Sequence, residues 1–251
     1  MKALAAWLGW LLLAGVALQL FFVLRIAAMV AIDPQSTSFQ RSEAWQIQTR
    51  GRSNAKDDAE WKQRWVPYDR IAEPLKRAVI ASEDAEFTYH QGIEWEAIER
   101  ARQRNAKAEE IAARRAAQAR ARGKEPSPPK IRGGSTITQQ LAKNLLLSGE
   151  RNLLRKGQEL VLATALEMLL DKRRILEIYL NSVEWGEGVF GAEAAAQHYF
   201  NKPAARLGSA EAARLAVMLP SPKFFERRTG SAYLAGRAST IVARMSAVDL
   251  P

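Results

Sequence analysis

The sequence predicts an all-α fold preceded by one transmembrane helix. Through most of the chain, apolar residues recur at the three- and four-residue spacing of helices, and the alternation typical of half-buried strands is almost absent. Near the N-terminus, 22 consecutive residues carry no charged side chain. With 251 residues and 47% hydrophobic composition, the chain is long enough to bury one sizeable core.

The composition excludes some kinds of site and concentrates the charge in one segment. There is no cysteine, which excludes disulfides and thiolate chemistry. Two histidines, His90 and His198, argue against a histidine-rich metal site. Residues 100–132 hold eleven Lys or Arg and three Glu, a net charge of +8 within a chain whose formal net charge is +10.

Residues 1–32 are expected to form an N-terminal membrane anchor. As a helix, Ala3 to Leu24 would span about 33 Å, which matches the hydrocarbon core of a bilayer. A cleaved signal peptide has a shorter apolar core than this segment, which favours an anchor that is retained. Cleavage is the alternative. Lys2 favours a cytoplasmic start, with the rest of the chain on the periplasmic side of the inner membrane, although Arg25 on the far flank weakens this argument.

Residues 33–66 are polar but include Trp45, Trp61 and Trp65. Tryptophan has an apolar body and a polar N–H group, which suits the boundary between water and an apolar phase. Two interpretations stay open, namely a linker and a collar at the membrane interface. The folded domain is expected over residues 67–251.

The first helix expected in the folded domain is EPLKRAVIASEDAEF, with Pro74 in its first turn. Its end carries the adjacent acids Glu83 and Asp84, just after an apolar turn. Desolvation there would raise the pKa of a carboxyl group and make it a usable proton acceptor near neutral pH. The alternative is an ordinary solvated helix end.

A long and mostly exposed helix is expected from Glu94 to about Arg122, ended by the prolines of Pro126 to Pro129. Its residues are mainly Ala, Arg, Glu and Gln, so it cannot contribute much to a core. The charge of this basic insertion, residues 100–130, suits acidic lipid headgroups or nucleic acid. A solvated insertion without a partner is the alternative.

The stretch RGGSTITQQLAKN, Arg132 to Asn144, is the most informative in the chain. The glycines Gly133 and Gly134 free the backbone, and a helix is expected to start after Thr136. Thr136 and Gln139 have the spacing of a capping box, in which each side chain accepts a hydrogen bond from the other residue's backbone.

This helix should have two distinct faces. Its apolar face would contain Ile137, Leu141 and Leu145, and its polar face Gln139, Gln140 and Lys143. Amide N–H groups, hydroxyls and one ammonium at a helix start suit an anionic, sugar-bearing ligand. The alternative is a well-capped amphipathic helix whose polar face simply meets water.

The most hydrophobic segment after the anchor begins at RKGQELVLATALEMLL and is expected to form the central buried helix. The apolar residues that support this are Leu160, Val161, Leu162, Leu166, Met168, Leu169 and Leu170. Within it, Glu159 and Glu167 each need a partner or a function. Arg155 lies four residues before Glu159, so an ordinary ion pair is one explanation.

The rest of the chain is expected to be helical around one loop. A short amphipathic helix is expected at DKRRILEIYLN. A glycine-rich loop that packs closely against another part of the protein is expected at EWGEGVFG. EAAAQHYF and SAEAARLAVMLP are two further helices, the second ended by Pro220, and residues 231–245 are the last one.

Four ordered motifs together resemble the monofunctional peptidoglycan glycosyltransferases. This family has a lysozyme-like helical domain that also occurs at the front of bifunctional penicillin-binding proteins. The matching stretches are Glu83 to Gly92, Gly133 to Asn144, Arg155 to Glu159 and Lys172 to Asn181, within a resemblance that covers residues 67–247. The basic insertion is longer than the family pattern leads us to expect. No further domain follows, so the resemblance implies no transpeptidase activity.

The resemblance implies a reaction and roles for residues. The reaction joins the disaccharide units of lipid II to a growing glycan chain, with inversion and with polyprenyl pyrophosphate as leaving group. By resemblance, Glu83 is the general base and Glu159 assists by orienting substrate or cations. Lys143 and Arg151 would neutralise the pyrophosphate, and Arg155 and Lys156 can converge with them. The substrate-binding candidates are Asp84, Phe87, His90, Ser135, Thr136, Gln139, Gln140, Lys143, Asn144, Arg151, Arg155, Lys156 and Asn181.

The implied partners are lipid II, the growing glycan chain, membrane lipids and other cell-wall synthesis proteins, with no nucleic acid. A divalent cation such as magnesium could assist at the pyrophosphate, but no residue pattern indicates its ligands.

Two other functions compete with this interpretation. A lytic enzyme of the same fold would cleave peptidoglycan strands, but it would use a protonated carboxyl group and would not need the cations. A membrane-tethered basic scaffold would use the basic insertion and leave the four motifs unexplained.

Overall fold

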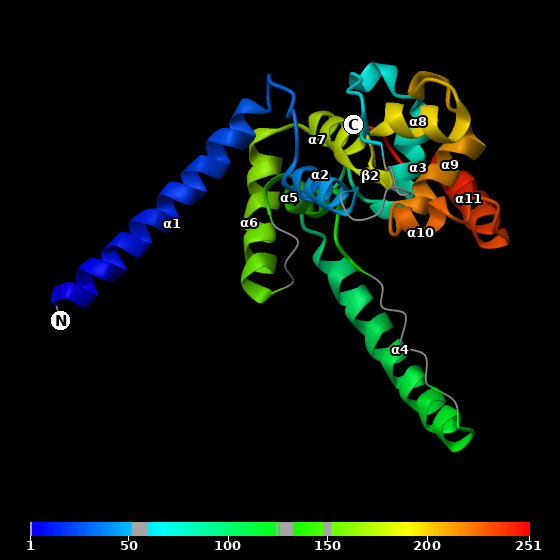
Figure 1. Cartoon of the computed structure of the whole chain (residues 1–251), viewed down its shortest axis with the longest axis horizontal. Helices are drawn as coiled ribbons and strands as arrows, with labels where there is room; N and C mark the ends of the chain where they lie inside the picture. Colours follow the sequence, from blue (N-terminus) through cyan, green and yellow to red (C-terminus); the bar gives the residue numbers. More distant parts are fainter. Residues whose placement is uncertain (1, 52–59, 124, 126–132, 148–151) are drawn as a thin grey trace.

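The computed structural model describes residues 2–51, 60–123, 125, 133–147 and 152–251, and in these residues the fold is helical, as predicted. Figure 1 shows a compact body from which two long helices project. The α-helices are α1 (Lys2–Ala28), α2 (Ser38–Gly51), α3 (Glu73–Glu83), α4 (Trp95–Ala121), α5 (Ile137–Leu146), α6 (Leu153–Leu169), α7 (Lys172–Ser182), α8 (Ala192–Phe200), α9 (Ser209–Met218), α10 (Pro222–Glu226) and α11 (Ala232–Arg244). Short 3-10 helices are η1 (Tyr68–Arg70), η2 (Ala204–Arg206) and η3 (Met245–Ala247).

The predicted glycine-rich loop contains part of a small sheet. The strands of this sheet are β1 (Lys62–Gln63), β2 (Glu184–Gly186) and β3 (Val189–Phe190), in the order β1-β3-β2. Only β2 and β3 belong to the loop. β1 runs parallel to β3, with Lys62 opposite Val189, and β2 runs antiparallel to β3. Strands this short give no alternating pattern, which is why the sequence predicts no sheet here.

The core of the body lies between two groups of helices. α3 packs against α9 and α11, and α5 packs against α2, α6 and α7. Most of the largest fully buried side chains come from these helices and from the β2–β3 region, and the others from α1 and from the segments after η1 and α3: Trp185, Tyr179, Phe87, Phe190, Ile26, Ile71, Leu75, Ile80, Ile137, Leu141, Leu145 and Leu162. This arrangement brings the end of α3 next to the start of α5, where the predicted site lies.

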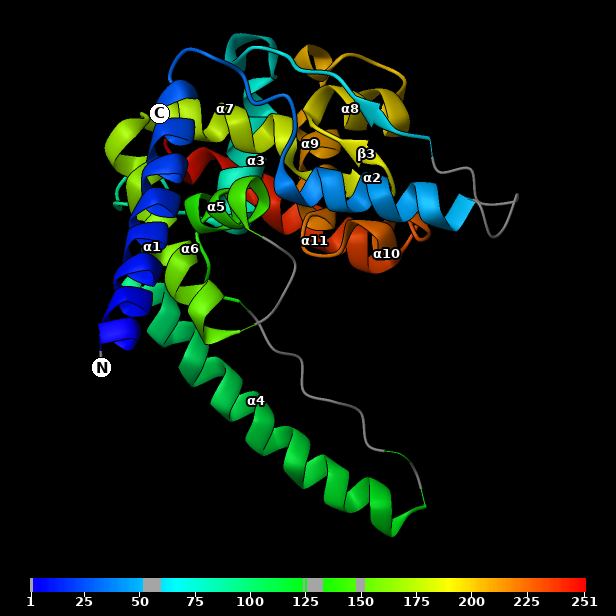
Figure 2. The same ribbon diagram turned by 60° about the vertical axis from the view of Figure 1, so that its left-hand side comes forward.

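α1 has the length and composition of a membrane span, and its first turns stand clear of the body (Figure 1). Its last turns pack beside α6 (Figure 2), where the amides of Gln19 and Gln158 exchange two hydrogen bonds of 2.9 Å. Ile26 is fully buried. Among the described residues, α1 is therefore joined to the body by packing at its C-terminal end.

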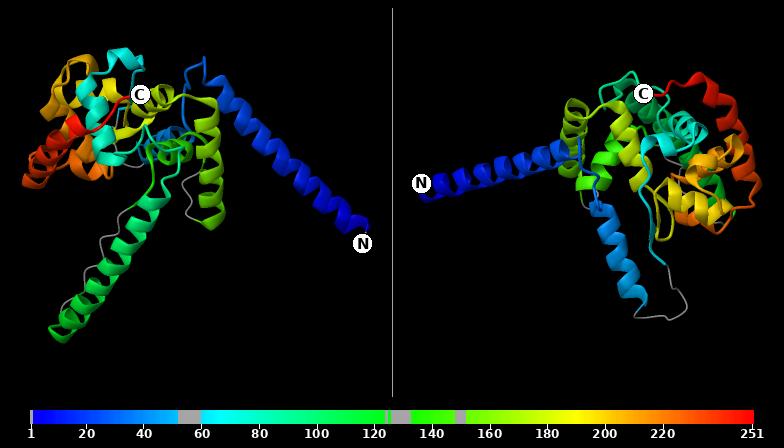
Figure 3. Two further views of the ribbon diagram at one scale, coloured as in Figure 1. Left: turned by 180° about the vertical axis from the view of Figure 1, so that it is seen from behind. Right: turned by 90° about the horizontal axis from the view of Figure 1, so that it is seen from above.

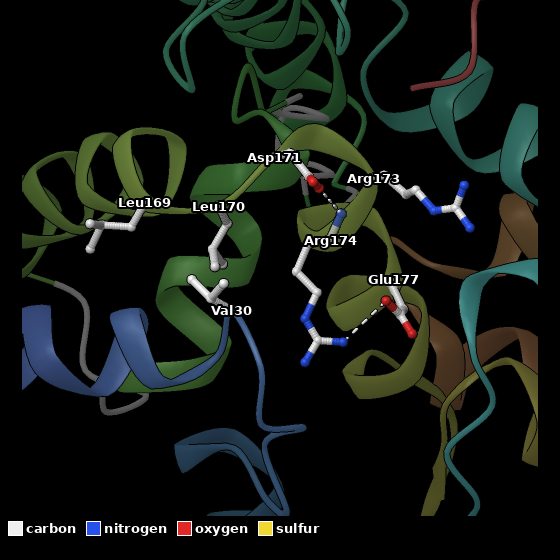
Figure 4. Close-up of a pocket in the computed structure, with 7 residues that line it drawn as sticks. All are labelled: Val30, Leu169, Leu170, Asp171, Arg173, Arg174 and Glu177. Carbon is white, nitrogen blue, oxygen red and sulfur yellow. Dashed lines mark hydrogen bonds and ion pairs between the residues drawn. The ribbon is translucent and has the colours of Figure 1, made fainter.

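Arg174 on α7 binds the segment that follows α1. Its guanidinium donates to Met29 O at 2.8 Å and pairs with Asp33 at 2.7 Å and with Glu177 at 3.1 Å. Figure 4 shows Arg174 and Glu177 beside a cavity of about 260 Å³ at the α6–α7 junction. The cavity is lined by none of the predicted site residues, and it lies where the segment after α1 meets the body.

Part of the predicted linker, residues 33–66, is built into the body. Thr37 and Gln40 form a capping box at the start of α2, with bonds of 3.0 and 2.8 Å. α2 is then held on the body by Ser38 Oγ, which donates to Leu145 O, and by Gln40 Nε2, which donates to Ser182 O. The residues that α2 buries, Gln40 and Glu43, are polar, so the helix has only a weak hydrophobic pattern.

α6 is not the central buried helix that the sequence predicts. Leu153 and Leu154 are 90% and 89% exposed, and Met168 is 79% exposed. The buried residues of α6 are Glu159, Leu162, Ala163 and Leu166, on the side that faces α5. Total hydrophobicity was misleading, because it does not show how many neighbours cover a helix.

Candidate active site

A cleft of about 430 Å³ opens beside α5, with α2 on one wall and β2 and α10 nearby. Four residues from the predicted set line it: Gln140, Lys143, Asn144 and Arg155. Other lining residues include Ser42, Glu43, Leu147, Glu184 and Pro222. The cleft is therefore bounded by residues from the second and third motifs and by elements that the motifs do not include.

Glu83 ends α3 and reaches this cleft through Gln140. The Nε2 of Gln140 donates to Oε2 of Glu83 at 3.0 Å, and the Tyr179 hydroxyl donates to Oε1 of Gln140 at 3.0 Å. Burial raises the pKa of Glu83, and the hydrogen bonds from Gln140 and Ser82 offset part of that rise. Burial also raises the pKa of Tyr179 well above its usual value, so the hydroxyl keeps its proton and remains a donor. Glu83 is thus a desolvated carboxylate held in a fixed orientation.

Asp84, next to Glu83, joins α3 to α5. It is buried, and its Oδ2 accepts a hydrogen bond of 2.9 Å from the backbone N–H of Ile137 in the first turn of α5. Nε2 of His90 lies 3.0 Å from both Asp84 oxygens, while Nδ1 of His90 accepts from the N–H of Gly92. Both ring nitrogens of His90 are therefore occupied, and His90 is not placed to compete with Glu83 as a base.

The predicted capping box at the start of α5 is present. Thr136 Oγ1 accepts from the N–H of Gln139 at 3.2 Å and donates to Gly92 O at 2.6 Å. Gln139 is fully buried, so its place on an exposed polar face was a wrong prediction. Its Nε2 has no hydrogen-bond partner among the residues that the structure describes.

Glu159 on α6 holds two cations together. Its side chain is 4% exposed, and Oε2 lies 3.2 Å from Nη1 of Arg155. Its Oε1 pairs with the Lys156 ammonium, which also donates to Ser135 Oγ at 3.3 Å. The carboxylate therefore links α6 to the glycine-rich start of α5, and it keeps Arg155 at the cleft despite the nearby Lys156 charge.

The second carboxylate of α6, Glu167, has a structural partner rather than a place in the cleft. It accepts from Thr138 Oγ1 at 2.5 Å and pairs with Lys172 at 2.8 Å. This explains why a carboxylate is tolerated near the end of an apolar helix.

Two predicted substrate contacts do not fit their positions. Phe87 is fully buried, with the Lys172 ammonium 4.6 Å from the centre of its ring. Asn181 is fully buried and exchanges hydrogen bonds of 2.9 Å with the N–H and C=O of Val66. Phe87 and Asn181 therefore support the site from the protein interior. Arg151, predicted at the pyrophosphate, lies outside the described residues.

The comparison with known proteins gives the family. The family described as Transglycosylase matches residues 51–246. The chain belongs to this family.

Its relatives cover most or all of the chain. It is 52% identical over 254 residues to a biosynthetic peptidoglycan transglycosylase of Burkholderia thailandensis, an alignment that covers 100% of this chain and 90% of the relative. It is 48% identical over 255 residues to the protein of that name from Herminiimonas arsenicoxydans, with 100% of both covered. A relative of that name from Bordetella pertussis is 52% identical over 87% of this chain and 82% of its own length.

The cleft of this transglycosylase also contains a charged cluster that the sequence analysis missed. Lys223 of α10 pairs with Glu43 of α2, and its Nζ lies 3.4 Å from Oε1 of Glu184. Burial raises the pKa of Glu184 to about 7, although the Lys223 charge acts in the opposite direction. The cluster joins α2 to α10 across one wall of the cleft. The sequence does not single out Glu43, because residues 33–66 are expected to be a linker or an interfacial collar, nor Glu184, because it follows the last motif.

The described residues of this transglycosylase offer no ready protein site for the predicted magnesium ion. No group of three or more His, Asp or Glu in that part of the chain is placed to hold a metal. Glu83 and Glu159 are bonded to an amide and to cations, respectively. A divalent cation would therefore need most of its oxygen ligands from the pyrophosphate itself.

Proposed function

We propose that this chain polymerises peptidoglycan glycan strands from lipid II by inverting transfer, with release of polyprenyl pyrophosphate. The proposal rests on a desolvated carboxylate, Glu83, held against a helix that also presents a cation to the cleft. Glu83 is held by Gln140, and Lys143 lies one turn further along α5 and lines the same cleft. A base and a binding site for an anionic leaving group are the two things that this reaction needs.

In the proposed step, the 4-hydroxyl of the acceptor sugar attacks the anomeric carbon of the donor. Glu83 takes the hydroxyl proton as the new glycosidic bond forms, and the bond to the pyrophosphate breaks with its electron pair. A raised pKa makes Glu83 a stronger proton acceptor than an ordinary surface carboxylate. One direct displacement inverts the anomeric configuration.

Lys143 and Arg155 would stabilise the charge that develops on the departing pyrophosphate. Both line the cleft, and Glu159 orients Arg155. Lys156 and Ser135 extend this polar surface towards the glycine-rich segment, and Arg151 is proposed to join them. Gln140 and Asn144 would contact the sugar through their amides.

The remaining predicted site residues act by support rather than by contact. Asp84, His90, Thr136 and Gln139 fix the start of α5 against the end of α3. Their hydrogen bonds keep Glu83 and Lys143 at a constant separation, which is a requirement for catalysis by positioning.

α1 is proposed to cross the inner membrane once, with its N-terminal Lys2 in the cytoplasm and the body on the periplasmic side. Its length and apolar composition suit a span. This placement would keep the cleft close to lipid II, the growing glycan chain and other cell-wall synthesis proteins.

The lytic alternative predicts a different use of the cleft. A glycosidase of this type needs one carboxylic acid and a second carboxylate beside the scissile bond. The two carboxylates that line the cleft, Glu43 and Glu184, are both engaged with Lys223. The cations around Glu159 favour an anionic leaving group instead.

Incubation of the purified full-length protein with labelled lipid II separates the two functions. The proposal expects polymer and polyprenyl pyrophosphate from lipid II alone, and no shortening of preformed glycan strands. Cleavage of preformed strands without polymer formation would establish the lytic function instead.

A further inference from the structure

The helix α4 carries a cationic face that the proposed reaction does not use. Arg104, Lys107, Arg115 and Arg122, at the end of the helix, are exposed. At about 100° per residue, these four side chains fall within an arc of roughly 80° on the helix surface. We call this set the basic face.

The basic face is not neutralised by the acids of its own helix. Glu96, Glu99 and Glu110 pair with other arginines, namely Arg100, Arg102 and Arg114. No ion pair involves the basic face within the part of the chain that the structure describes. Beyond Glu110, the remaining residues of α4 include no acid.

The start of α4 packs on the body, through a side that lies next to the basic face, since at about 100° per residue Ala101 is roughly 40° from Arg115. Ala101 is 5% exposed, and it lies against Gly134 in the segment that leads into α5. A Cβ atom at Gly134 would come within 2.9 Å of the Ala101 Cβ and 2.8 Å of the Ala97 carbonyl oxygen. This close approach sets where α4 leaves the body. Among the residues that the structure describes, none covers the basic face, whose four side chains are exposed.

The position of α4 indicates what the basic face meets. In Figures 1 and 2, and from behind in Figure 3, α1 and α4 leave the body at different places and diverge, but the free ends of both helices lie below the body. α1 is the candidate membrane span, so α4 is held on the membrane side. The helix has few large apolar residues, which suits binding at a charged surface rather than insertion into hydrocarbon.

We propose that the basic face of α4 binds the anionic phospholipid headgroups of the membrane that α1 enters. Each Lys or Arg close to an anionic membrane surface strengthens binding by roughly fivefold. Because α4 is clamped to Gly134, this contact would also set the height of the start of α5 above the bilayer. None of the proposed catalytic residues lies on α4, so the proposal stands independently of the reaction.

The chain has no cysteine, so a single label can report this contact. Gln118 is exposed and projects on the same side as the basic face, and Gln118→Cys would carry a fluorophore there. The labelled full-length protein is placed in nanodiscs of phosphatidylcholine alone or of an equal mixture with phosphatidylglycerol. A quencher is attached to the lipid headgroups.

Two double variants provide a matched comparison, because each removes two positive charges from α4. Arg104→Gln with Arg115→Gln changes the basic face, whereas Arg102→Gln with Arg120→Gln changes another side of the helix. The proposal expects quenching in the phosphatidylglycerol discs that is lost at high salt. The first pair should lower the ratio of bound to unbound helix by roughly 30-fold, and the second pair should change it far less.

Three outcomes would overturn the proposal. They are equal quenching in both kinds of nanodisc, equal loss in both double variants, and quenching that requires added glycan polymer. The last result would identify the polymer as the partner instead. Circular dichroism on both double variants checks that α4 remains helical.

Discussion

Nε2 of Gln140 lies 3.0 Å from Oε2 of Glu83, and this bond joins the first turn of α5 to the last residue of α3. It ties the proposed base to the helix that also carries Lys143. The Tyr179 hydroxyl completes the chain by donating to Gln140 at 3.0 Å. The orientation of the base and the position of a cation thus depend on the same helix.

Removal of the Gln140 amide should change the pH dependence of polymerisation. Burial raises the pKa of Glu83 and the Gln140 hydrogen bond lowers it, so Gln140→Ala should raise this pKa further. The acidic limb of the plot of kcat against pH should therefore move to higher pH. A variant with reduced kcat and an unmoved acidic limb would show that Gln140 does not act on the ionisation of Glu83.

Replacement of Glu159 should impair catalysis more than replacement of Glu167, although both are buried on α6. Glu159→Gln leaves Arg155 and Lys156 without their counter-ion, so kcat should fall by about tenfold or more as their positions loosen. Glu167→Gln breaks the contacts to Thr138 and Lys172. It should lower the melting temperature and retain most of the activity. Equal effects on kcat would argue that both acids act through stability alone.

Lys143 should act on the transition state rather than on substrate affinity. Lys143→Ala should lower kcat by roughly 10²-fold or more, because the charge on the leaving pyrophosphate grows as the bond breaks. Lys202→Ala, which removes an ion pair to Glu211 away from the cleft, is the control. A change confined to KM would mean that Lys143 only docks the substrate. Arg151→Ala is expected to behave like Lys143→Ala.

Deletion of the basic insertion should leave the chemistry intact. With Arg102 to Pro128 replaced by a short linker, polymerisation of detergent-solubilised lipid II should stay within about tenfold of the full chain, a barrier change of about 1.4 kcal/mol. The assay avoids the membrane, so it isolates catalysis from any contact with lipid headgroups. A much larger loss in a folded protein would place part of the insertion in the site.

The local features of the sequence predicted α3, α4, α5 and α7 because their signals are carried by neighbouring residues. The capping box of Thr136 and Gln139 is one example. The same kind of signal, in Thr37 and Gln40, marks α2, but it lies in a polar segment whose composition predicts a linker or an interfacial collar. Recognition of that second capping box would have placed α2 in the fold.

Burial and long-range pairing were beyond what the sequence could indicate. Gln139 carries a polar side chain and is fully buried, whereas Leu153 is apolar and 90% exposed. Glu43 and Lys223 meet across 180 positions of sequence. Such contacts depend on how α2 and α10 pack on the body, which no local pattern encodes.

The central claim is that Glu83 accepts the proton of the acceptor hydroxyl, and Glu83→Gln tests it most directly. Glutamine keeps the shape and can still meet Gln140, but it cannot take a proton. The folded-state pKa of Glu83 is raised, so this group favours folding while protonated and loses that contribution as the pH rises through its pKa. A neutral replacement should therefore leave the melting temperature at pH 7 unchanged or slightly higher.

The measurement is the initial rate of glycan polymer formation from lipid II by folded Glu83→Gln, with Glu86→Gln as the control. Glu86 lies in the same motif and is exposed. We expect the rate of Glu83→Gln to fall by roughly 10²–10⁴-fold, the usual contribution of general base catalysis, with lipid II binding retained. Polymerisation by folded Glu83→Gln at a rate close to that of Glu86→Gln would contradict the assignment of the base.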